Sequence, residues 1–218
     1  MLKENDSLVQ VKICGLTSMD DVHIIEKYGA DYAGMVLYYP KSKRNIDINL
    51  AAVLVAQLKK SDIKSVAVVV SPDVSQLEAI QNAGFDYIQI HGEFSDEDVY
   101  KACSVRIIRA VNIKHQSEED IYLETKRWRS LDKIYGLLFD AGVPGSGKTF
   151  DWESLKKADC GNKKLFLAGG LTPDNVKAAI EAVRSDVVDI SSGVEYDDVS
   201  VKGKDESKVK AFIQNAKF

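Results

Sequence analysis

Short runs rich in β-branched residues alternate with longer segments of helical periodicity along this chain, and no other feature constrains the fold as strongly. The eight runs predicted as strands are 9–14, 32–38, 64–70, 87–91, 105–111, 133–140, 164–168 and 187–191. A helix is predicted after each strand, and the residues expected to start these helices are Ser18, Asn49, Asp73, Ser95, Ser117, Asp151, Thr172 and Asp205. Strict alternation implies parallel strands, so eight units in 218 residues predict an α/β fold, the closed (β/α)8 or TIM barrel. An open, doubly wound sheet stays the alternative, because alternation alone does not prove closure.

The chain is expected to be one domain, because no Pro/Ser-rich or low-complexity linker interrupts the eight units. Residues 1–218 then form a single barrel, with residues 1–8 as a short N-terminal extension. A net charge of −4 gives no electrostatic reason to expect a nucleic-acid partner, and no apolar run approaches the roughly 20 residues that cross a membrane. The cysteines Cys14, Cys103 and Cys160 lack the spacing of a disulfide framework or a zinc site. These features predict a cytoplasmic protein.

Side chains of a barrel strand alternate between the helices and the interior, and function lies at the C-terminal strand ends. Apolar residues occupy one face of four strands, so their polar residues are expected to point inward, namely Lys12, Cys14, Gln89, His91, Asp140, Asp189 and Ser191. A lone cysteine in an apolar strand is more often a small buried hydrophobe than a reactive group. An inward carboxylate such as Asp140 is more informative, because carboxylates are seldom buried without a partner or a task. We expect His23 and His115 to be ordinary surface or edge residues.

Glycines follow the last two predicted strands, in AGGLTPDN at 168–175 and SSGVE at 191–195. A glycine directly after a strand lets the backbone approach a ligand, so that amide N–H groups bind an anion. Barrels of this type commonly place a phosphate at this pair of loops. The sequence therefore predicts a phosphate site there.

The segment GVPGSGKT at 142–149 fits the nucleotide-triphosphate loop pattern G-x-x-x-x-G-K-[ST]. In a nucleotide loop the helix begins at the Lys-Thr pair, whereas here the helical pattern starts at Asp151. We interpret the segment as a long active-site loop after Asp140, with Lys148 within reach of substrate. A nucleotide-binding ATPase or switch, another phosphosugar barrel enzyme and a catalytically silent phosphate-binding module stay open as rival interpretations.

Six motifs occur in order along nearly the whole chain from Val9. They are VKICGLT (11–17), YPKSKR (39–44), IQIHG (88–92), LLFDAGVPGSGKTFDW (137–152), LAGGLTPDNV (167–176) and VDISSGVE (188–195). Together they resemble the phosphoribosylanthranilate isomerase family, whose members carry out an Amadori rearrangement in tryptophan biosynthesis. The resemblance implies an aldose-ketose type isomerase on a TIM barrel that acts on a small phosphosugar without a metal or an organic cofactor. We expect it to work as a monomer or a homodimer, with no nucleic-acid or membrane partner.

The resemblance also assigns roles to matching positions. It makes Cys14 the general base and Asp140 the general acid, and it gives Arg44 the anthranilate carboxylate. His91 and Asp189 match residues near the sugar or the ring. The matching phosphate cradle is formed by the backbones of Gly169, Gly170, Ser192 and Gly193. The chemistry agrees with this assignment, because a neutral carboxylic acid can protonate the ring oxygen and a thiolate can take the proton from carbon 2. We expect a nearby cation such as Lys12 to increase the thiolate fraction of Cys14.

Overall fold

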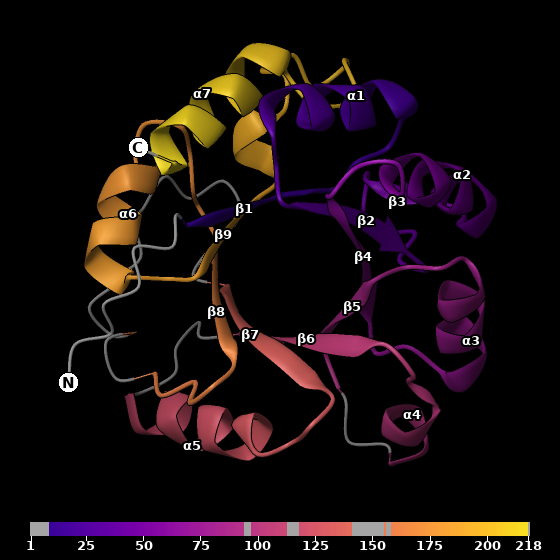
Figure 1. Cartoon of the computed structure of the whole chain (residues 1–218), viewed down its shortest axis with the longest axis vertical. Coiled ribbons are helices and arrows are strands. Elements are labelled where there is room, and N and C mark those ends of the chain that lie inside the picture. The colour runs from indigo at the N-terminus through magenta and orange to yellow at the C-terminus, as the bar shows by residue number, and fades with distance from the viewer. Residues whose placement is uncertain (1–8, 94–96, 113–117, 141–154, 156–157, 218) are drawn as a thin grey trace.

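The computed structural model describes residues 9–93, 97–112, 118–140, 155 and 158–217, which form a closed barrel of parallel strands inside a ring of helices (Figure 1). The barrel strands are β1 (Gln10–Cys14), β2 (Tyr32–Leu37), β4 (Lys64–Val70), β5 (Tyr87–His91), β6 (Arg106–Asn112), β7 (Ile134–Asp140), β8 (Lys164–Ala168) and β9 (Val187–Ile190). Each pairs in parallel with its neighbours, and β1 pairs with both β2 and β9. The predicted TIM barrel is confirmed, and the open-sheet alternative is wrong.

A ninth strand, β3 (Asn45–Ile46), was not predicted from the sequence. It pairs in parallel with the C-terminal end of β2, where Leu37 lies opposite Ile46. Two residues carry too short a pattern to indicate a strand, so only this pairing reveals it. The strand lengthens the sheet locally at the barrel mouth and fixes the segment that carries Arg44.

Seven α-helices lie outside the strands among the described residues. They are α1 (Met19–Tyr28), α2 (Ile48–Leu58), α3 (Val74–Asn82), α4 (Glu97–Ala102), α5 (Glu118–Arg129), α6 (Val176–Val183) and α7 (Glu206–Ala216). The helix expected after Asp151, and the expected start residues Ser95 and Ser117, fall outside the described residues. The same is true of residues 1–8, so the N-terminal extension stays a prediction.

The start residues of three helices are confirmed, because Ser18, Asp73 and Asp205 accept hydrogen bonds from backbone N–H groups of the first turn. The predicted start at Asn49 is wrong. The capping residue of α2 lies two residues earlier, because the Asp47 carboxylate accepts a hydrogen bond from the Asn49 backbone N–H at 2.9 Å.

The predicted start at Thr172 is also wrong. The Thr172 backbone N–H donates to Asn175 Oδ1 at 2.8 Å, and the Asn175 N–H donates to Thr172 Oγ1 at 3.3 Å. These reciprocal bonds close a turn, so α6 begins only after Asn175. The Val176 N–H also donates to the Thr172 carbonyl oxygen at 3.1 Å, so this turn leads directly into the helix.

The alternation of strand side chains divides the apolar core into two layers. The residues predicted to face the helices pack in the outer layer, and they are Val11, Ile13, Ile88, Ile90, Leu137, Phe139, Val188 and Ile190. The inner layer fills the barrel with Cys14, Tyr32, Val66, Val68, Ile108, Ala110, Leu138, Phe166, Ala168 and Val187. Both predicted faces are confirmed, so the barrel is a packed core and not a pore.

Aromatic rings close the N-terminal end of the barrel. Tyr32 packs edge-on against Phe166 with ring centroids 5.6 Å apart, and Tyr87 packs against Tyr135 at 4.6 Å. The hydroxyl groups of Tyr32 and Tyr135 lie 3.0 Å apart. This packing leaves the opposite end, where the strands finish, as the end that can receive a ligand.

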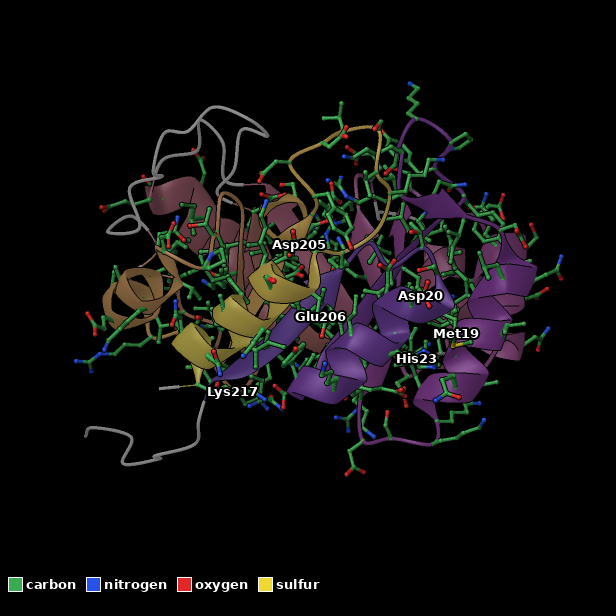
Figure 2. All side chains as sticks on the ribbon, turned by 90° about the horizontal axis from the view of Figure 1, so that it is seen from above. Met19, Asp20, His23, Asp205, Glu206 and Lys217 are labelled. Atoms are coloured by element: carbon green, nitrogen blue, oxygen red, sulfur yellow. The ribbon has the colours of Figure 1, made fainter. Side chains whose placement is uncertain are left out.

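The first and last helices, α1 and α7, lie side by side (Figures 1 and 2). Lys27 Nζ and the Tyr28 hydroxyl of α1 both donate to Glu206 Oε1 of α7, at 2.7 and 2.8 Å. His23 on α1 is exposed, as expected, and His115 lies outside the described residues. These contacts join the first and last helices of the ring.

Candidate active site

A buried ion pair joins the first and last barrel strands near the mouth. Lys12 on β1 lies opposite Asp189 on β9 in the parallel register, and Lys12 Nζ lies 2.9 Å from Asp189 Oδ2. The Lys12 side chain has an exposed fraction of 0%. Burial lowers the pKa of Lys12, but the negative charges of Asp189 and Cys14 outweigh it and raise the pKa above its ordinary value. Lys12 therefore stays charged beneath the site.

Cys14, the last residue of β1, is 8% exposed and lies opposite Gly34 of β2. Burial raises the pKa of the Cys14 thiol, Asp189 raises it further, and the cations Lys12 and Lys204 oppose the change without cancelling it. The prediction that Lys12 favours the thiolate is right in sign. Burial outweighs this attraction, so the pKa of the Cys14 thiol still lies above its ordinary value.

Asp140, the last residue of β7, is partly buried at the same end of the barrel as Cys14. Burial raises the pKa of Asp189, Lys12 opposes the change, and the charge of Asp140 raises the pKa further. Asp189 thus interacts electrostatically with both Asp140 and Cys14. Cys14 and Asp140 therefore end strands at the same mouth of the barrel, and each is coupled electrostatically to Asp189.

His91 ends β5 and faces the same interior. Its Nε2 lies 2.8 Å from Gln89 Nε2. Burial lowers the pKa of His91 to about 4, and the charges of Lys12 and Arg109 act in the same direction. The imidazole is therefore neutral at pH 7 and offers the site a polar, uncharged group.

Arg44 lies where the β2 and β1 loops meet, and its side chain crosses over Gly15, the residue after Cys14. The guanidinium forms a double ion pair with Glu195, in which Nε bonds Oε1 and Nη2 lies 3.1 Å from Oε2. Lys43 Nζ lies 2.8 Å from Glu195 Oε2, and Lys204 Nζ lies 3.4 Å from Oε1. Three cations thus surround one carboxylate.

Glu195 holds this cluster together. Burial favours the neutral acid, but the hydrogen bonds from Arg44 and Lys43 and the charge of Lys204 outweigh it and lower the pKa of Glu195 to about 2. A cavity of about 110 Å³ opens beside the cluster, and the exposed apolar side chains Val199 and Val201 line it as well. The excess positive charge and the apolar wall suit a ligand that combines an anion with an apolar body.

The glycines of the two predicted phosphate loops have distinct reasons to be glycine. Gly169 and Gly170 follow β8 with φ of 89° and 67°, a region that other residues rarely adopt. Gly193 lies in a short 3₁₀ helix, Ser192–Val194, and a Cβ there would collide with the Leu171 carbonyl oxygen of the neighbouring loop. The two loops therefore approach each other backbone to backbone at the C-terminal ends of β8 and β9.

The family model described as N-(5'phosphoribosyl)anthranilate (PRA) isomerase matches residues 11–215. The chain belongs to this isomerase family. The N-(5'-phosphoribosyl)anthranilate isomerase of Streptococcus mutans is 41% identical over 211 residues, which cover 96% of this chain and 100% of the relative. That of Aquifex aeolicus is 39% identical, covering 96% and 99%. The resemblance seen in the six motifs is confirmed, and the protein is an enzyme of the isomerase class.

Solved structures of the isomerase family share the whole barrel. The phosphoribosyl anthranilate isomerase of Thermotoga maritima is 34% identical with a TM-score of 0.82, covering 96% of this chain and 99% of that one. A phosphoribosyl anthranilate isomerase in complex with reduced 1-(o-carboxyphenylamino)-1-deoxyribulose 5-phosphate is 31% identical with a TM-score of 0.79, covering 96% and 99%. A thiamine phosphate pyrophosphorylase of Pyrococcus furiosus, at 16% identity and a TM-score of 0.67, shares the fold alone.

Two members of the site escaped the sequence analysis of this isomerase. Glu195 stands in the motif VDISSGVE, but no spacing in the sequence connects it to Arg44, which is 151 residues away. Lys204 is 1% exposed, although it comes from a polar loop that carries no signal of burial. Both are recognisable only once the barrel brings its first and last loops together.

Other expectations are resolved more simply. Cys103 and Cys160 are buried, as expected of small hydrophobes. Lys148 and the segment 142–149 lie outside the described residues, so their interpretation as a loop over the site stays a prediction. In the part of the chain that the structure describes, no group of three His, Cys, Asp or Glu side chains could hold a metal ion, and no helix is long and apolar enough to cross a membrane.

Proposed function

We propose that this isomerase converts N-(5-phosphoribosyl)anthranilate into 1-(2-carboxyphenylamino)-1-deoxyribulose 5-phosphate, the Amadori rearrangement of tryptophan biosynthesis, by general acid-base catalysis. The observation that carries the proposal is the position of Cys14 and Asp140. Each ends a strand at the same mouth of a barrel of this family, and both interact with Asp189 between them.

The first step opens the ribofuranose ring. Protonated Asp140 donates its proton to the ring oxygen while the bond between that oxygen and carbon 1 breaks. The nitrogen lone pair forms the new double bond, which gives an iminium ion and leaves Asp140 as a carboxylate. Asp140 must therefore enter the cycle protonated, and the two negative groups of the substrate favour its neutral form.

The second step moves the carbon 2 proton. The iminium makes this proton acidic, and the Cys14 thiolate removes it to give an enolamine that tautomerises to the ketone. Because burial disfavours the thiolate, the base form depends on nearby positive charge, which the iminium and the Lys12 ammonium both supply.

The anionic ends of the substrate match two separate parts of the mouth. We assign the phosphate to the backbone N–H groups of Gly169, Gly170, Ser192 and Gly193, where two loops with exposed backbone meet. We assign the anthranilate carboxylate to Arg44, whose cluster carries more positive than negative charge. His91 and Asp189 would then face the sugar between the two anchors.

The wider setting follows from the same proposal. Residues 1–218 act as one domain, in the cytoplasm, without a nucleic-acid or membrane partner. A solved relative is described as monomers of the dimeric isomerase of Thermotoga maritima. We infer that this chain acts as a monomer or a homodimer, since each barrel carries a complete set of the proposed residues.

Genetic complementation tests the proposal. The gene should restore growth without tryptophan to a strain that lacks the isomerase, and the Cys14→Ser variant, expressed to the same level, should not. Failure of the unaltered gene to rescue, with soluble protein present, would refute the proposed activity. Rescue by Cys14→Ser would refute the role given to the thiol.

A further inference from the structure

Gly34 occupies the middle of β2, where a glycine weakens a strand and so calls for a reason. Its backbone does not provide one, because Gly34 is not among the glycines with positive φ. The space around Gly34 does provide a reason. A Cβ at Gly34 would lie 2.9 Å from Cys14 Sγ and 3.0 Å from Lys12 Nζ. Any side chain at this position would collide with both groups.

The same geometry bounds the distance between the thiol and the ammonium. Two atoms that each lie about 3 Å from one point are at most about 6 Å apart, which is the range in which an opposite charge moves a pKa. The Cys14 charge raises the pKa of Lys12, and the Lys12 charge lowers that of Cys14. Because Gly34 has no side chain, it leaves the space in which the side chains of Lys12 and Cys14 meet.

Lys12 is held in this place from the other side. Its Nζ is 2.9 Å from Asp189 Oδ2, the two residues are paired across adjacent strands, and neither reaches solvent appreciably. The other carboxylate oxygen, Asp189 Oδ1, is buried and has no hydrogen-bond partner among the residues that the structure describes. Lys12 is held at its backbone by the strand and at its ammonium by Asp189. Its side chain therefore lacks the rotational freedom of an ordinary lysine, and its charge stays in one place.

We propose that Lys12 is a positioning residue for the isomerase reaction, whose ammonium, held by Asp189 in the space that Gly34 leaves open, stabilises the Cys14 thiolate before it takes the carbon 2 proton. The inference rests on the proposed function, in which Cys14 is the general base. It adds Gly34 to the groups on which turnover depends, and it states how Lys12 is held beside the thiol.

Several charges face Cys14, and their signs give the proposal its test. Lys12 and Lys204 favour the thiolate, and Asp189 opposes it, while the charge of Asp140 acts on Asp189. His91, from β5, is neutral at pH 7 and adds no charge. Removing the ammonium and removing the carboxylate must therefore change the thiolate fraction in opposite directions, although both changes break the same ion pair.

The reaction of Cys14 with iodoacetamide, without substrate, measures the thiolate fraction directly. Mass spectrometry of the peptide that carries Cys14 gives its rate at a fixed pH below the thiol pKa. Lys12→Met should lower this rate by at least about tenfold, as the loss of an opposite charge within a few ångströms implies. Asp189→Asn should raise it. Lys204→Met removes another buried ammonium and serves as the matched control, with a smaller decrease than Lys12→Met.

Gly34→Ala tests the space itself by steady-state kinetics. The added methyl group should lower kcat by about 100-fold, the usual effect of displacing a reacting group by an ångström, and should leave KM nearly unchanged. If Lys12→Met alone does not fold, the double variant Lys12→Met/Asp189→Leu replaces the pair by apolar groups, which buried pairs often tolerate. Removing both charges also removes the ammonium, so the double variant should alkylate more slowly than Asp189→Asn.

The outcomes separate this inference from the proposed function. An unchanged alkylation rate in Lys12→Met, or equal decreases in Lys12→Met and Asp189→Asn, would overturn the inference, even where Cys14→Ser abolishes turnover and so supports the base. If the rates change in opposite directions while Cys14→Ser retains full turnover, the thiol–ammonium pair stands and the proposed role of Cys14 fails.

Discussion

Replacing Glu195 by Gln removes the carboxylate that three cations share, and the structure sets the size of the resulting loss of stability. The pKa of Glu195 is lowered to about 2, against an ordinary value of about 4.3. At about 1.36 kcal/mol for each pH unit this is about 3 kcal/mol of folding free energy. The side chain is 12% exposed, and the cations Arg44 and Lys43 are more exposed than that, so screening reduces the expected loss to about 2 kcal/mol.

The sign of the pH dependence follows from the direction of the change. A carboxylate whose pKa is lowered by folding stabilises the protein above its unfolded pKa, and this stabilisation is lost as pH falls toward the folded value. The free energy of unfolding of the unaltered protein should therefore exceed that of Glu195→Gln by about 2 kcal/mol at pH 7. The difference should shrink below about pH 4.3 and vanish near pH 2.

Urea unfolding followed by circular dichroism between pH 7 and pH 3 measures this difference. Glu206→Gln is the matched control, because Glu206 also bonds two partners but its side chain is 47% exposed, so its replacement should change stability little. A Glu195→Gln variant as stable as the original at pH 7 would contradict the reasoning. So would a difference that stays constant as the pH falls.

Three further predictions follow from the site and the barrel. Gly193→Ala should raise KM for the phosphosugar more than it lowers kcat, because the new methyl group meets the Leu171 carbonyl oxygen and separates the two phosphate loops. Steady-state kinetics measures this change, and an unchanged KM would argue against the phosphate cradle. Phe166→Ala should lower the free energy of unfolding in urea by about 3–5 kcal/mol, since the ring is fully buried among the tyrosines that close the barrel. A loss below about 1 kcal/mol would mean that neighbouring side chains fill the cavity left by the ring. Calorimetry with magnesium-ATP should show no binding, whereas micromolar affinity would restore the nucleotide-loop interpretation of residues 142–149.

The barrel could be predicted because its signal is local and repeated. Each strand carries its own alternation, so the faces of Lys12, Cys14 and Asp189 follow from period two alone. The eight repeats then leave few topologies. Where the prediction failed, neighbouring residues offered the same chemistry. Asp47 and Asn49 are both good helix starters, and only the hydrogen bonds of Asp47 decide between them.

The electrostatics of the site could not be predicted in the same way. The sequence places Lys12 two residues from Cys14 and so predicts the attraction, but it does not contain the depth of burial, which raises the pKa of the thiol by more than Lys12 lowers it. Glu195 and Lys204 reach the site from the last loop, and their partner Arg44 comes from the segment before β3. Contacts between such distant loops arise from closure of the barrel, so no spacing of residues in the sequence indicates them.

The account depends on Cys14 as base and Asp140 as acid, and single-turnover kinetics on the purified variants tests this most directly. With the loss of substrate fluorescence as the signal, Cys14→Ser and Asp140→Asn should each convert N-(5-phosphoribosyl)anthranilate about 100- to 10,000-fold more slowly than the original protein, with unchanged circular dichroism. Conversion at the original rate by either folded variant would contradict the account.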